Sequence, residues 1–251
     1  MSGRRLAALA ALALLVLAAN AHGQTTRTTR SSAHAWLDLT GDLWLTPRLG
    51  IQAESKVERS RFAAAPQLYE LRAGLERPWG GAIVAAGGML VHSSPYGPFP
   101  AASATNEYRV WEQATLDQHV GRVALSHRYR FEERWIERPH ATSDGPATGR
   151  SFRLRMRYQA RGTFPLGGSA AQRAPYLVGF DEVFVSLGPH TALNLLDQNR
   201  AALGIGMRWS AAVRTEANYV DQVILRADGR QVENNHTLQL AMNVTRGTPR
   251  R

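Results

Sequence analysis

Long segments in which polar and apolar residues alternate constrain the fold of this chain more than any other feature. From Val123 to Phe131, apolar side chains, aromatic side chains and one histidine occupy the odd positions, and mostly polar side chains, two of them arginines, lie between them. Residues 152–159 and 236–245 repeat this pattern. Because successive side chains of a strand point to opposite faces, each segment predicts a β-strand with one apolar and one polar face.

The alternation extends over most of the chain and predicts eleven strands. They lie near residues 33–45, 48–59, 67–77, 81–92, 106–117, 121–138, 150–164, 175–187, 197–209, 213–224 and 235–245. The links after residues 45, 77, 117 and 209 are short, whereas those after 92, 138, 187 and 224 are long. Such loop asymmetry and strand length are typical of membrane barrels. The sequence therefore predicts an all-β fold, an antiparallel up-and-down β-barrel of roughly 10–12 strands of the outer-membrane type.

The odd number of predicted strands conflicts with a rule for such barrels. Bacterial single-chain barrels have even numbers of strands. We therefore expect that one predicted strand is false, or that a further strand lies within residues 188–196 or before residue 33.

The first residues have the three parts of a secretory signal peptide. Arg4 and Arg5 precede an apolar run from Leu6 to Ala19, and small residues follow, with cleavage expected after Ala21 or Gly23. The run is shorter than the about 20 apolar residues of a spanning helix. We therefore expect residues 1–23 to be a signal peptide and residues 24–251 a single β-barrel domain in the cell outer membrane of a Gram-negative envelope.

The net charge of +10 comes almost entirely from arginine, and Lys56 is the only lysine. A basic excess first indicates nucleic acid, but export removes the chain from cytoplasmic nucleic acid, which we exclude as a partner. Outer-membrane lipid and lipopolysaccharide are the expected partners, because the guanidinium fork suits phosphate. Alternatively, arginine simply replaces lysine at ordinary solvated positions. The oligomeric state is left open.

Arginine rows identify the face that avoids lipid. An arginine facing lipid costs about 2–4 kcal/mol at the membrane midplane, so we expect these rows to line the lumen, with glutamates of the same parity pairing with them. The lumen and anion-site candidates are Arg109, Arg128, Arg130, Arg134, Arg153, Arg155, Arg157, Glu107 and Glu132. An anion site among them and complete internal neutralisation, which would make the lumen purely structural, are the two alternatives.

Three smaller features break the simple pattern. Glu112 and Glu133 fall by parity on the apolar face; a β-bulge at Glu112 and a place near the membrane edge for Glu133 are the favoured explanations, and a functional carboxylate is the third. Gly204 and Gly206 lack the helix and third glycine of a dinucleotide motif, so we expect them to relieve crowding on the lumen face.

Four strings in order along the chain carry a family resemblance. They are NEYRVWEQ at 106–113, HRYRFEERW at 127–135, DEVF at 181–184 and DQNR at 197–200. In these strings the chain resembles the bacterial family called domain of unknown function 2490, over about residues 35–244. The resemblance implies an exported β-barrel-like protein and assigns no activity to any residue.

The sequence contains no recognisable catalytic motif. Ser126 and His127 are adjacent in a strand and face opposite sides, metal-ligand spacing is absent, and we expect no metal or cofactor. The expected function is therefore a barrel with an Arg/Glu-lined lumen that forms a narrow pore, holds an anion or is purely structural. Alternatives are a membrane-embedded enzyme acting on lipid or lipopolysaccharide, and a soluble periplasmic barrel that binds an apolar ligand.

Overall fold

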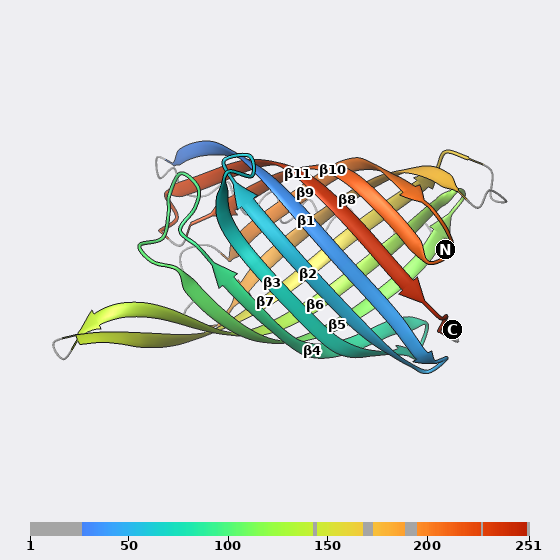
Figure 1. The fold of residues 1–251 in the computed structure, drawn as a ribbon, viewed down its shortest axis with the longest axis horizontal. Coiled ribbons are helices and arrows are strands. Elements are labelled where there is room, and N and C mark those ends of the chain that lie inside the picture. The colour runs from blue at the N-terminus through green and yellow to red at the C-terminus, as the bar shows by residue number, and fades with distance from the viewer. Residues whose placement is uncertain (1–26, 143–144, 168–172, 189–194, 227, 250–251) are drawn as a thin grey trace.

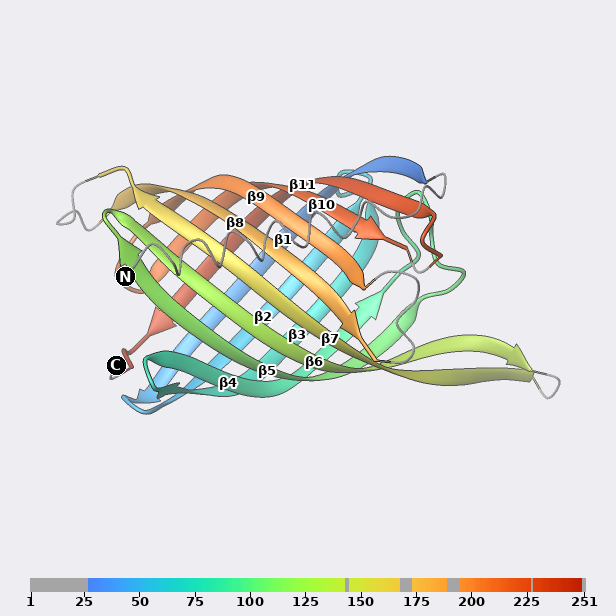
Figure 2. The same cartoon turned by 180° about the vertical axis from the view of Figure 1, so that it is seen from behind.

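The structure is a computed structural model that describes residues 27–142, 145–167, 173–188, 195–226 and 228–249. The predicted signal peptide lies outside these residues. Eleven strands form one closed barrel (Figures 1 and 2). They are β1 (Thr28–Thr46), β2 (Leu49–Ser60), β3 (Ala65–Trp79), β4 (Ala82–Ser93), β5 (Thr105–Val120), β6 (Val123–Thr142), β7 (Gly145–Pro165), β8 (Ala174–Leu187), β9 (Leu196–Arg208), β10 (Val213–Leu225) and β11 (Gln231–Arg246).

The barrel closes through parallel pairing of its first and last strands. Each strand pairs antiparallel with its sequence neighbours, while β1 and β11 run parallel from Thr28 opposite Gln231 to Leu43 opposite Arg246. A parallel seam joins an odd number of strands without a gap, so the expectation of an even count is wrong. Residues 28–32, where a further strand was expected, belong to β1 itself. In the other expected place, β9 begins at Leu196, and residues 189–194 lie outside the described part.

The two ends of the barrel differ in their connections. At one end, which we call the turn end, β1–β2, β3–β4 and β5–β6 are joined by two residues each. At the other end, the loop end, residues 94–104 connect β4 to β5, and β6 and β7 extend past the barrel as a hairpin (Figures 1 and 2). The long link predicted after residue 138 is wrong, because its residues continue the two strands, which pair as far as Thr142 and Gly145.

The outer surface is apolar and the interior is polar. Every strand carries at least one exposed large hydrophobic side chain at an outward position, among them Leu37, Leu39, Leu71, Leu75, Leu90, Met156, Leu203, Ile205, Leu238 and Leu240. The buried side chains include more polar and charged residues than hydrophobic ones. This is the reverse of a soluble barrel. Arg130, Arg155 and Arg157, which lie on the charged face of the alternation, are buried.

Candidate functional site

The arginine rows of β6 and β7 lie side by side on the lumen face. Antiparallel register places Arg134 opposite Arg153 and Arg130 opposite Arg157. Between these two Arg–Arg pairs, Glu132 lies opposite Arg155. Like charges opposite each other in a sheet are destabilising, so this arrangement requires counter-charges, and the carboxylate at its centre is the nearest one.

Glu132 is the centre of an ion-pair network. Its Oε2 accepts hydrogen bonds from Nη2 and Nε of Arg155 at 2.6 and 2.9 Å, and its Oε1 accepts one from Nη1 of Arg157 at 2.8 Å. Nη1 of Arg109 lies 3.5 Å from Oε2, and Nη1 of Arg130 lies 3.9 Å from Oε1. Four arginines therefore surround one carboxylate whose side chain is fully buried.

Two further carboxylates neutralise the flanks of this network. Glu182 on β8 accepts hydrogen bonds from Arg157 at 2.9 Å and from Arg128 at 2.8 Å. Glu107 on β5 accepts from Arg109 at 2.6 Å and from Arg134 at 2.5 Å. Eight of the nine sequence-predicted site residues thus belong to one connected network of ion pairs.

Aromatic rings fill the space between these ions. The Trp111 ring faces the guanidinium carbons of Arg72 and Arg130 at 4.6 and 5.6 Å. Phe184 faces Arg157 at 4.5 Å, and Arg155 and Arg200 at 5.2 and 5.1 Å. These are cation–π distances. Neither ring was among the residues predicted for the site, although both have the parity of the charged residues on their strands.

Together, the ions and rings close the lumen at this level. Arg130 is 2% exposed, Phe184 1%, and Glu132 and Trp111 0%, so water reaches almost none of their surface. Barrels of about 8 strands fill their interior with side chains, whereas 16–18 strands leave a channel. An eleven-stranded barrel lies between these limits, and long arginines and large rings fill its extra width.

Other ion pairs continue the neutralisation along the lumen. Arg72 pairs with Glu54, Arg161 with Glu216 and Arg226 with Glu233. Lys56 lies 3.2 Å from Asp38, and Arg200 lies 3.6 Å from Glu58. Most of the charged lumen side chains described above therefore have an ion-pair partner.

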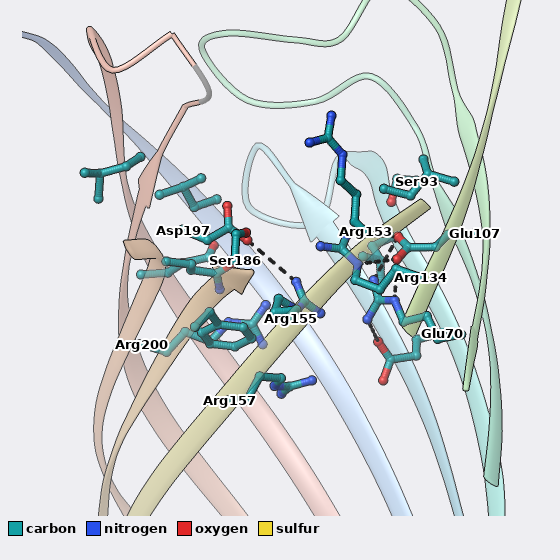
Figure 3. Close-up of a pocket in the computed structure, with 18 of the residues that line it drawn as sticks. Glu70, Ser93, Glu107, Arg134, Arg153, Arg155, Arg157, Ser186, Asp197 and Arg200 are labelled. Atoms are coloured by element: carbon teal, nitrogen blue, oxygen red, sulfur yellow. Dashed lines mark hydrogen bonds and ion pairs between the residues drawn. The ribbon is translucent and has the colours of Figure 1, made fainter. Parts of the chain in front are cut away.

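A cavity of about 370 Å³ lies on the loop-end side of the closed layer (Figure 3). Phe184, Arg155 and Arg157 form part of its floor, and Tyr96 from the 94–104 loop lines it as well. Its lining also includes Arg153, the last of the nine predicted residues. Within the described part of the chain, Arg153 makes no ion pair and no side-chain hydrogen bond.

The model of the family described as Protein of unknown function (DUF2490) matches residues 33–233. The chain belongs to this family. No curated protein and no solved structure matches the chain significantly. The match covers every strand from β2 to β10 and all the lumen residues described above, so the network lies within the part that the family model recognises.

In this DUF2490 barrel, no hydrogen bond joins a serine or threonine hydroxyl to a histidine among the described residues. His34 and Ser60 are direct partners across β1 and β2 and both are buried. However, the Nδ1 atom of His34 contacts Oε1 of Gln67 at 2.5 Å, and in the described part of the chain no hydrogen bond joins His34 to Ser60. The described residues also contain no group of three or more potential metal ligands, and no helix among them is long and apolar enough to cross a membrane, a result that does not concern strands.

Proposed function

We propose that this chain is an exported outer-membrane barrel that holds a solute in a closed-ended cavity and does not conduct ions. The apolar outer face supports the membrane location, because the large apolar side chains that every strand exposes are unfavourable in contact with water. The polar, ion-paired interior supports it too, since a soluble barrel buries its apolar face instead.

The observation that carries the proposal is the burial of the network around Glu132. A conducting barrel needs a continuous water-filled path, whereas the layer of Arg130, Glu132, Trp111 and Phe184 leaves almost no water-accessible surface. The cavity on the loop-end side therefore ends blindly at this layer. This geometry favours binding over passage.

Cell fractionation tests the location. The protein should stay with outer membranes after a carbonate wash, and mass spectrometry of the mature chain should find its N-terminus near His22 or Gln24. Release by carbonate would favour the soluble periplasmic alternative, and retention of residues 1–19 in the mature protein would contradict export.

Planar-bilayer recording tests the closed lumen. The wild-type protein should show no steady conductance, because the buried ion pairs occupy the cross-section. A steady conductance that becomes more cation-selective in the Arg155→Glu variant would establish an open pore and refute the proposal. Folding of both proteins is checked by the heat-dependent gel mobility shown by many membrane barrels (an assay independent of conductance).

A further inference from the structure

Charge compensation is uneven between the closed layer and the cavity above it. In the layer, each of Arg130, Arg155 and Arg157 contacts Glu132. In the cavity, Arg153 lies directly opposite Arg134 on the same face. Arg134 has one carboxylate partner among the described residues, Glu107, and shares it with Arg109. Arg153 itself has no ion-pair partner among the described residues. Among the described residues, a counter-charge is therefore missing beside Arg153.

The surroundings of Arg153 supply further donors. Arg155 lies one lumen position further along β7. On the cavity side, its Nη1 atom is 3.9 Å from Oδ2 of Asp197, and its cross-strand partner is Ser186. Ser93 lines the opposite wall beside Glu107 (Figure 3). In this view Arg153 lies between the Glu107–Arg134 pair and the Ser186–Asp197 side of the cavity. The charges of Arg153 and Arg134 are thus not fully compensated. Their guanidinium groups line the same cavity as the hydroxyl groups of Ser93 and Ser186.

We propose that this cavity binds a phosphoryl group, with Arg153 and Arg134 as its main ligands and Arg155 and the serines as supporting donors. A phosphate monoester carries a charge of about −1.5 to −2 at neutral pH and three strong acceptor oxygens. It therefore matches more than one arginine, whereas a carboxylate is neutralised by one. The planar guanidinium fork binds two such oxygens at once. The inference rests on the proposed function, because it requires that the cavity be a binding site.

The rest of the cavity indicates that the ligand has a small organic part. A volume of about 370 Å³ exceeds that of one phosphate and falls in the lower range of small-molecule pockets, about 300–1,000 Å³. The lining also includes apolar side chains, namely Leu68, Ile136, Leu187, Ile224 and Leu225. A phosphomonoester of a small polyol or sugar fits this combination. The same group is present in lipid headgroups, so the experiment must separate the two sources.

Calorimetric titration of the full chain, folded in a phosphate-free non-ionic detergent, tests the site. The probe is glycerol 3-phosphate, with glycerol and acetate as controls at constant ionic strength. The wild-type protein should bind the ester saturably, and Arg153→Gln should weaken it about tenfold or more, as expected for a lost charge-assisted hydrogen bond. Arg48→Gln removes the same charge from an exposed turn and should leave the affinity unchanged. Arg153→Lys, which keeps the charge but not the fork, should lie between.

Absence of saturable binding by the wild-type protein, or equal binding by the wild type and a folded Arg153→Gln variant, would overturn the inference. If Arg153→Gln does not fold, Arg153→Lys must show the weakened affinity instead. Competition of lipopolysaccharide micelles with the ester would assign the phosphoryl group to a lipid headgroup; binding of the ester alone would assign it to a free solute. The two proposals fail separately: a conductance with intact ester binding refutes only the closed lumen, and a silent bilayer without ester binding refutes only the phosphoryl site.

Discussion

Arg130 and Arg157 lie directly opposite each other on β6 and β7, and both are buried in the lumen. This arrangement is stable only because each guanidinium has its own partners. Arg130 donates two hydrogen bonds to Oε1 of Gln113, at 3.0 and 2.7 Å, and Arg157 donates to Glu132 and Glu182. Both arginines also contact Glu132, which therefore compensates part of the charge of each. We expect the stability of the closed layer to depend on this carboxylate.

Glu132→Gln should strongly destabilise the barrel. The change leaves buried arginines without their shared counter-charge, and breaking a buried ion pair costs about 3–5 kcal/mol. The free energy of unfolding can be measured by urea titration of the protein in lipid vesicles that allow refolding, with tryptophan fluorescence as the signal. Glu137→Gln is the control on the same strand, since Glu137 pairs with the exposed Arg150 and its loss should cost less than about 1 kcal/mol. Equal effects of the two changes would contradict the central role of Glu132.

Thiol labelling should distinguish the two faces of β7 and β8. The native chain has no cysteine, so single substitutions report their own environment. In vesicles, a water-soluble maleimide should label Ser186→Cys, which lines the cavity, and leave Met156→Cys unlabelled, because that outward side chain would face lipid. Labelling of Met156→Cys together with protection of Ser186→Cys would reverse the model of a lipid-facing outer surface.

Local pattern was enough to predict the strands and their faces, because the alternation of side chains is a property of each strand alone. Closure was not predictable in this way, since the pairing of β1 with β11 joins segments about 200 residues apart. The bulge expected at Glu112 is also wrong: the register of β5 is continuous, with Glu112 paired to Ala86 and Phe131. Among the described residues, no hydrogen bond or ion pair compensates the outward carboxylate of Glu112.

The members of the charged network were predictable, but its connections were not. Parity places Arg155 and Glu132 on the same kind of face, whereas their contact depends on the register of β6 with β7. Parity also carried a signal for Trp111, which lies among Glu107 and Arg109 on β5. Sequence alone does not show that arginines stack on such a ring, so Trp111 was not predicted to belong to the site.

A cross-link should confirm the parallel seam. Leu37 on β1 and Leu240 on β11 are direct partners and both point outward. We expect cysteines at these two positions to be joined by a short bifunctional thiol reagent in the folded barrel. A pair at Leu37 and Leu203 is the control, because Leu203 is exposed on β9, which does not adjoin β1. Cross-linking of the control pair alone, or of neither pair in folded protein, would contradict the closure.

Two adjacent glycines of β4 provide a test of packing beside Trp111. A Cβ atom on Gly87 would lie 2.1 Å from the carbonyl oxygen of Ala73 and 2.5 Å from Cα of Gly74, both of them backbone atoms that cannot move aside alone. The indole of Trp111 lies over Gly74 and donates a hydrogen bond to the Gly88 carbonyl at 3.1 Å, so a shift of these strands would disturb the closed layer.

Gly87→Ala should therefore destabilise the barrel by about 1–3 kcal/mol, the usual cost of overpacking. Gly88 faces outward with open space around the position of a Cβ atom. Gly88→Ala should therefore be neutral, or stabilise the barrel by up to about 1 kcal/mol because alanine lowers the conformational entropy of the unfolded chain. Urea unfolding in vesicles measures both. If Gly87→Ala unfolds at the wild-type urea concentration, the close approach of β3 and β4 beneath Trp111 is not a constraint on the fold, and the layer must tolerate a wider barrel than the one described.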